Sequence, residues 1–271
     1  MYSFPENLFT EVRIEKSEYV NYYTANGEVE ANNQSQVIGA LIRVFDGDMW
    51  YSSVTNEPGK IQAEIDNLAS LAKRNEKIYD HPVIKNFGSH KASILKYDGE
   101  DDVRKITPRQ REELVAHYIS VCLDKSTEEM KGYGGSYYST HIVKEYYSSK
   151  GAEIRQDMQR CSVWVGAAFA VGGVTTWGGK NFQGMSFDRL LGREREIQDD
   201  LERYLDYARN AVNIQPGDYT CVLSPAATAL FTHESFGHKS ESDYMLSDWP
   251  LQEEWVLGKA VGHEGAFICD N

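Results

Sequence analysis

The sequence predicts an α+β fold, in which helices pack on antiparallel sheets and a further strand and helix begin a second domain. Three observations lead to this prediction. Segments in which polar and apolar residues alternate are joined by short turns that contain glycine, which is typical of antiparallel hairpins. Other segments carry apolar residues at every third or fourth position, as one face of a helix does. Near residue 216 a proline–glycine break precedes a short apolar run and a helix-start signal.

We expect a first region at residues 1–105, built mainly from hairpins. The strand that ends at Thr24 runs into Asn26-Gly27, a strong signal for a two-residue hairpin turn. A second turn at Asp46-Gly47 separates two further strands. A helix should follow, and short strands are expected at 83–84 and 92–95. The apolar stripe of this helix consists of Ile61, Ile65, Leu68 and Leu71.

The middle region, residues 106–216, should contain a helix, several strands and a longer helix. Thr107, Pro108 and Gln110 have the spacing of an N-cap, a first-turn proline and a capping box. The apolar face of this helix would consist of Leu114, Val115, Tyr118, Ile119 and Cys122. Strands are expected at 137–147, 152–159 and 161–170, and the longer helix at 186–212. His117 and His141 lie in these elements without ligand neighbours, so we assign them structural roles.

The third region, residues 217–271, should open a second domain. Tyr219–Leu223 reads as a short buried strand, and Ser224-Pro225 as the cap of the helix that follows it. After Asp243 we expect a loop, and then a strand at Ala266–Cys269.

The helix after Ser224 contains His233, Glu234 and His238, which are the residue types of a zinc enzyme: imidazoles bind the metal and a carboxylate serves as general base. The two histidines are five positions apart, so on a regular α-helix they would point roughly 140° away from each other. A π-bulge or a break would bring them to one side, and such bulges are frequent at functional sites. Gly237 lies where the backbone would deform, and glycine tolerates deformation best. Two histidines can also lie this close in a sequence by chance, and a structural or surface role for them is equally reasonable.

Two carboxylates, Glu241 and Asp243, follow directly. Imidazoles that bind a metal usually donate their second N–H to a carboxylate or a carbonyl, and either residue could accept it. A solvated acidic turn is the alternative.

The stretch from Ser224 to Asp243 closely resembles the signature helix of the TldD/PmbA metallopeptidases, and of the TldD-like branch in particular. The resemblance implies a zinc ion on His233 and His238, with Glu234 as the catalytic base. It implies peptide substrates that are unfolded, and an enclosing dimer, either a homodimer or a heterodimer with a PmbA-like subunit.

In that family the third zinc ligand is a cysteine near the far C-terminal end, and no residue here matches that position. We therefore expect the N-terminal portion of such a protein, assign Cys269 to a buried strand and regard His263 as a weak candidate ligand. A non-catalytic partner subunit, or an incomplete fragment that keeps the fold without a full metal site, is the alternative. Iron or manganese in place of zinc also stays open, because two histidines with nearby carboxylates suit these metals too.

Composition excludes other classes. The formal net charge of −13 and the lack of a basic run argue against a nucleic-acid partner. No apolar stretch reaches the about 18 residues of a membrane span, and the N-terminus lacks the pattern of a signal peptide. The cysteines show no CxxC pair, which favours reduced, mostly buried thiols and a cytoplasmic location. They are Cys122, Cys161, Cys221 and Cys269.

Overall fold

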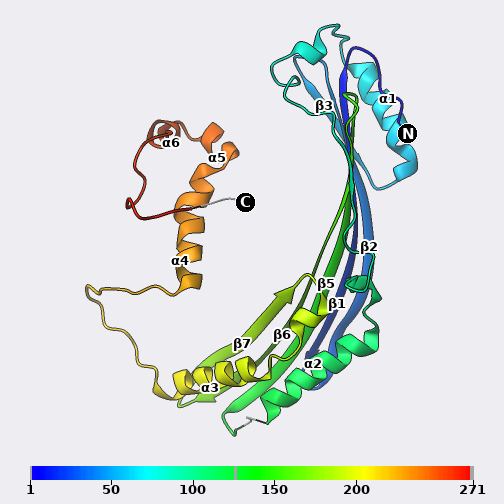
Figure 1. Cartoon of the computed structure of the whole chain (residues 1–271). Helices are drawn as coiled ribbons and strands as arrows, with labels where there is room; N and C mark the ends of the chain where they lie inside the picture. The colour runs from blue at the N-terminus through cyan, green and yellow to red at the C-terminus, as the bar shows by residue number, and fades with distance from the viewer. Residues whose placement is uncertain (1, 125–126, 269–271) are drawn as a thin grey trace. The chain divides into compact units, whose positions relative to one another are not determined.

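The computed structural model describes residues 2–124 and 127–268. It divides into two compact units, Met1–Val212 and Asn213–Asn271, which are described separately below. The α+β class expected from the sequence is confirmed, since a large, mainly antiparallel sheet and packed helices make up the first unit (Figure 1). No helix within the described ranges is long and apolar enough to cross a membrane.

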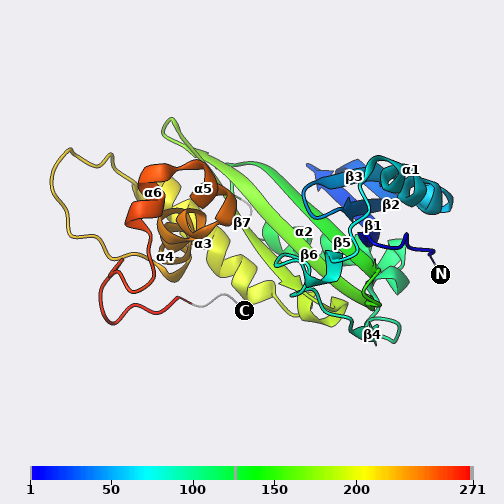
Figure 2. The ribbon, with the colours of Figure 1, turned by 90° about the horizontal axis from the view of Figure 1, so that it is seen from above.

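The sheet of the first unit has seven strands in the order β3-β2-β1-β5-β6-β4, with β7 also paired to β6. Only the β4–β6 pair is parallel. Four of the strands are long and curve together along the unit, as Figures 1 and 2 show. The strands are β1 (Phe9–Ala25), β2 (Glu28–Phe45), β3 (Trp50–Thr55), β4 (Lys91–Ile94), β5 (Met130–Ser148), β6 (Glu153–Val171) and β7 (Val174–Gly184).

Both predicted turns are present. Asn26 and Gly27 have φ angles of 49° and 88°, so the β1–β2 hairpin closes with two left-handed residues, as its right-handed strand twist favours. At the second turn the Asp46 carboxylate accepts hydrogen bonds from the backbone nitrogens of Asp48 and Met49, at 2.9 and 2.8 Å. Gly47, at φ 109°, supplies the left-handed residue there.

Three helices pack on one face of the sheet: α1 (Ile61–Leu71), α2 (Pro108–Leu123) and α3 (Glu194–Asn210). We name the two hydrophobic clusters beneath them the α1 cluster and the α2–α3 cluster. The α1 cluster includes Val12 and Ile42, and the α2–α3 cluster includes Tyr22 and Val163. Because side chains alternate along a strand, Val12 and Tyr22 lie on the same face of β1, and residues such as Arg13 lie on the opposite one.

The capping box of α2 is confirmed: the Thr107 hydroxyl accepts from the Gln110 nitrogen, and the Gln110 side chain accepts from the Thr107 nitrogen. Most of the expected face of α2 is buried, with Ile119 half-buried against the cluster. The stripe of α1 is shorter than expected. Leu71, the last residue of the helix, is 65% exposed, and Ala69 is buried instead.

Two expectations for the first unit need correction. Residues 83–84 lie in a turn, and the predicted second strand of this stretch is the short β4. The helix expected at 186–212 is divided into a 3-10 turn at Phe187–Leu190 and α3. The regions expected at 1–105 and 106–216 share one sheet, because β1 pairs along its length with β5.

Cys122 and Cys161 are buried in the first unit, and burial raises the pKa of each thiol to about 12. Cys221, in the second unit, is exposed, contrary to the general expectation of burial. Cys269 lies outside the described residues.

The regular elements of the second unit, over its described residues, are all helical and lie between Pro225 and Glu254. The unit contains α4 (Pro225–Thr232), a π-helix (His233–Gly237), a 3-10 turn (His238–Ser240), α5 (Ser242–Ser247) and α6 (Trp249–Glu254). Short helices therefore replace the loop expected after Asp243. Tyr219–Leu223 is exposed and forms no strand, because the described part of this unit offers no other strand to pair with it. Residues 266–268 are likewise not in a strand.

Candidate metal centre

The helix that carries the site begins as the sequence predicts. The Ser224 hydroxyl accepts a hydrogen bond from the Ala227 nitrogen at 3.3 Å, and Pro225 occupies the first turn. Proline fits there because the first helical N–H groups have no partner within the helix. The cap fixes Pro225 as the first residue of α4, and His233 therefore follows eight residues later in the helix.

The helix changes its hydrogen-bonding pattern at His233. Residues His233–Gly237 form a π-helix, and the His238 nitrogen donates to the His233 carbonyl oxygen, five positions back. A π-turn takes up one residue more than an α-turn, so residues five apart come to the same side. The rings of His233 and His238 accordingly lie face to edge, with centroids 4.6 Å apart. The distortion expected from the spacing is present.

The turn brings three ligand-type groups together. One donor atom each from His233, Glu234 and His238 lie within 4.8 Å of one another. The Nε2 atom of His238 is 3.7 Å from a carboxylate oxygen of Glu234. In the described part of the chain this is the one group of three or more such side chains that could hold a metal ion.

The two carboxylates downstream are placed differently. Glu241 Oε1 lies 2.8 Å from Nδ1 of His238, so Nδ1–H donates to it and Nε2 keeps its lone pair on the side of Glu234. Asp243 accepts instead from the backbone nitrogen of Tyr244 at 3.0 Å. Glu241 is therefore the residue that orients an imidazole.

Gly237 does not play the part expected of it. Its φ and ψ of −56° and −60° are ordinary right-handed helical values, which any residue adopts. A Cβ atom there would lie 3.8 Å from Nδ1 of His233, which is an ordinary contact. The π-turn distributes the extra residue over several positions, so no single residue needs the freedom of glycine.

Residues that the sequence reasoning missed support the turn. The Ser235 hydroxyl donates to the Phe231 carbonyl oxygen at 2.6 Å, a bond of the kind that bends helices. The Trp255 indole nitrogen, at the end of α6, donates to the Ser240 hydroxyl at 3.0 Å, and its ring packs against Phe236. A serine inside an apolar helix could have signalled the first contact, whereas the second depends on tertiary structure.

The other histidines lie elsewhere. His117 is exposed on α2 and bonds Glu194 at 2.8 Å, and His141 is buried 3.5 Å from Asp157. His263 accepts from the Gly265 nitrogen at 3.1 Å and is not part of the group. The weak candidacy of His263 as a ligand therefore gains no support.

The three side chains fit a zinc ion in their chemistry. Zinc prefers imidazole nitrogen with carboxylate or thiolate completing the set, and it keeps an open position in catalytic sites. Here a carboxylate fixes the tautomer of one imidazole, as is usual for a metal ligand. His233 and Glu234 are exposed and His238 is half-buried, so an ion and a further ligand can reach them.

The chain is therefore an α+β protein whose first unit has a long sheet with helices on one face, and whose second unit has a histidine pair on a π-turn that forms a candidate metal centre. Residues 10–78 match the family model described as PmbA/TldA metallopeptidase domain 1. A metalloprotease of Methanocaldococcus jannaschii is 22% identical over 97% of this chain and 58% of its own length. A zinc metalloprotease TldD homolog of Saccharolobus solfataricus is 25% identical over 68% of this chain and 42% of its own.

Solved structures agree in fold. A Bacteroides thetaiotaomicron protein, described as a candidate modulator of DNA gyrase, superposes with a TM-score of 0.69 at 16% identity, over 88% of this chain and 54% of that one. TldE of Thermococcus kodakarensis gives 0.51 at 14% identity, over 74% and 44%. The chain thus spans roughly half of the length of these relatives. The chain is similar to TldD/PmbA metallopeptidases, as the residues around His233 had indicated.

Proposed function

We propose that this chain carries part of the catalytic centre of a zinc-dependent peptidase of TldD type, which hydrolyses peptide bonds in unfolded peptides or small proteins. The observation that carries the proposal is the π-turn, because it turns His233 and His238 toward each other beside Glu234. The names of the relatives, metalloprotease and zinc metalloprotease, support the same class.

In this proposal His233 and His238 hold the zinc ion, and Glu241 keeps the His238 ring oriented through the 2.8 Å contact to Nδ1. A bound zinc ion would act as a Lewis acid on the peptide carbonyl and would make water a stronger acid. Glu234 accepts the proton that the attacking water loses, and later delivers it to the leaving amine. Its carboxylate is suited to both steps, because it is 60% exposed and faces the imidazole pair.

The remaining parts of the proposal come from the resemblance. The third ligand lies outside the described residues, and the working enzyme is a homodimer or a heterodimer with a PmbA-like subunit. We propose that it acts in the cytoplasm, in keeping with unpaired cysteines such as Cys122 and Cys161.

Metal analysis and a peptidase assay test this function together. The purified protein should contain zinc, and His233→Ala should lose it. Glu234→Gln should keep the zinc and lose cleavage of an unfolded protein such as reduced, alkylated casein, because the amide cannot accept the proton. Cleavage by Glu234→Gln at the wild-type rate would refute the role of Glu234.

A non-catalytic partner subunit is the second candidate, and one observation favours it. With Glu234 assigned as the base, the group within the described residues offers two imidazoles and no further ligand. Protein that takes up no zinc or other divalent metal, even when refolded with it, would support this reading and refute the peptidase.

A further inference from the structure

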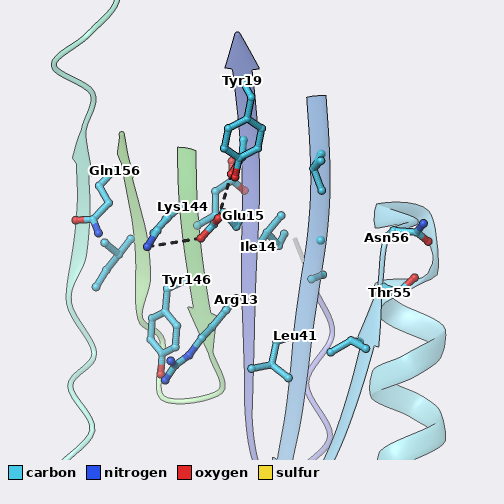
Figure 3. Close-up of a pocket in the computed structure, with 17 residues that line it drawn as sticks. Arg13, Ile14, Glu15, Tyr19, Leu41, Thr55, Asn56, Lys144, Tyr146 and Gln156 are labelled. Atoms are coloured by element: carbon cyan, nitrogen blue, oxygen red, sulfur yellow. Dashed lines mark hydrogen bonds and ion pairs between the residues drawn. The ribbon is translucent and has the colours of Figure 1, made fainter. Parts of the chain in front are cut away.

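A groove and a cavity lie on opposite faces of the sheet of the first unit. The groove, of about 990 Å³, is on the face opposite the helices, where Lys144 pairs with Glu15 at 3.5 Å (Figure 3). The cavity, of about 250 Å³, is on the helix side, and we name it the α2 cavity. In the α2 cavity a buried charge lacks a partner of opposite charge among the described residues, as shown below.

The α2 cavity lies where the start of α2 meets the middle of the sheet. Its lining side chains come from three neighbouring strands, on which they share one face and two rows of the register. These residues are Glu18 and Val20 of β1, Gln34 of β2, and Ser139 and His141 of β5. Residues 103–108, which lead into α2, and Arg111, on its first turn, complete the lining.

Arg111 is a buried guanidinium without a counter-charge. It is 5% exposed, and its Nη2 atom donates to Asn32 Oδ1 at 3.1 Å, while Nε has no hydrogen-bond partner within the described part of the chain. Asn32 in turn donates to the Glu112 carboxylate at 3.3 Å, so Glu112 is joined to Arg111 through an amide. Arginine keeps its charge in proteins, and a buried charge is costly unless an opposite charge compensates it. The position therefore favours a bound anion.

His141 offers a second buried donor, from the strand side of the cavity. It is 2% exposed, and neither ring nitrogen has a hydrogen-bond partner among the residues that the structure describes. Its Nε2 atom lies 3.5 Å from a carboxylate oxygen of Asp157, which is longer than a normal hydrogen bond. An imidazole carries at least one N–H, neutral or charged, so His141 has a donor that a ligand oxygen in the cavity would satisfy.

The carboxylates around the cavity have other partners. Glu18, which lines it, lies 3.9 Å from Nη1 of Arg104. Asp102 accepts from Nε and Nη2 of Arg104, each at 2.8 Å. Asp157 accepts from two backbone nitrogens at 2.7 and 3.0 Å. The charge of Arg111 thus stays uncompensated, and the partial positive charge at the start of α2 adds to it.

We propose that the α2 cavity binds a small oxyanion, a phosphate or carboxylate group, through Arg111 and His141. A guanidinium forms strong, charge-assisted hydrogen bonds with either group, and the Nε atom of Arg111 is free to donate. A volume of about 250 Å³ is below that of sites for drug-sized ligands, so the ligand is a small molecule. The cavity shares no residue with the group around His233, and binding does not depend on the proposed peptidase function.

Equilibrium dialysis with ³²P-labelled inorganic phosphate, and in parallel with ¹⁴C-labelled malonate, tests the proposal. The buffer is metal-free Tris–chloride of fixed ionic strength, so that general screening is the same throughout. The wild-type chain should bind one equivalent of at least one of the two anions. Binding of either supports the site, and the anion that binds more tightly shows whether phosphate or carboxylate is the natural group.

Four variants identify the residues that bind the anion. Arg111→Gln should weaken binding by about 10- to 100-fold, and His141→Phe by about tenfold, because each removes a hydrogen bond to a charged group. Arg109→Gln is the matched control on the same turn of α2: this arginine pairs with Glu113 at 2.7 Å on the surface, and its loss should leave binding unchanged. His233→Ala should also bind like wild type, which separates this site from the metal centre.

Urea unfolding checks that the variants are folded and gives a second readout. The midpoint of the wild-type chain should rise with the concentration of the anion that binds, because binding to the folded state stabilises it. The midpoint of Arg111→Gln should not change with that concentration.

A wild-type chain that binds neither anion overturns the assignment, as does Arg111→Gln with the affinity of wild type. An equal loss of binding in Arg109→Gln also overturns it, because general positive charge would then account for the binding.

Discussion

Replacing Glu241 by alanine should weaken zinc binding by about tenfold. Glu241 accepts from Nδ1 of His238 at 2.8 Å, and this contact holds the ring with Nε2 toward Glu234. Loss of such a partner typically costs about 10- to 100-fold in metal affinity. The two side chains are 41% and 48% exposed, so water replaces part of the contact and we expect the lower end of that range, about 1.4 kcal/mol.

Competition with a chromogenic zinc chelator near neutral pH measures this change. Asp243→Ala is a matched control, because it removes the same charge two residues away but breaks a hydrogen bond to Tyr244 rather than to an imidazole. Its affinity should stay within about twofold of wild type, the change expected from a screened surface charge. Equal losses in both variants would show that general electrostatics, and not ring orientation, sets the affinity, and would refute the reasoning.

Three further predictions concern the first unit. Glu11→Ala should destabilise this unit by about 3 kcal/mol, because the buried carboxylate is the partner of Arg43 and of Tyr146. Glu15→Ala removes an exposed ion pair and should cost less than about 1 kcal/mol. Equal midpoints of the two variants in urea unfolding would contradict this prediction. Thr107→Ala should cost about 1 kcal/mol through the lost cap of α2, and an unchanged midpoint would show that the cap is dispensable. Burial raises the pKa of Asp46, but the hydrogen bonds from backbone nitrogens outweigh it, so the folded pKa is below the ordinary value of 3.8. The contribution of Asp46 to stability is thus present above pH 3.8 and is lost as the pH falls through the folded pKa. Asp46→Asn should remove that part of the dependence of unfolding on acid pH. An unchanged profile of stability against pH would contradict the assignment.

Features that depend on a few neighbouring residues were predictable from the sequence. The Asn26-Gly27 turn and the capping box at Thr107 follow from local backbone chemistry, and both are present. The π-turn at His233 followed from a spacing that only a distorted helix can use. In each case the residues that specify the feature are also those that form it.

Features that depend on distant partners were not predictable. Tyr219–Leu223 has the composition of a buried strand, but a strand needs a neighbour for its backbone, and the described part of the second unit offers none. The groove of about 990 Å³ on the sheet face opposite the helices arises because Gly39, Glu15 and Lys144 lie opposite one another in the register of three strands, which no local pattern encodes. For the same reason the sequence left Glu241 and Asp243 equivalent, whereas the geometry separates them.

The long strands β1 and β5 have a consequence for how the first unit melts. They run side by side from the α1 cluster to the α2–α3 cluster, and each cluster is built on them. Disordering one end therefore frees strands on which the other end depends, so both should unfold in a single cooperative step. In a polypeptide cut between Lys105 and Ile106, the edge of β1 that pairs with β5 would be unpaired in the first piece, and neither piece could fold by itself.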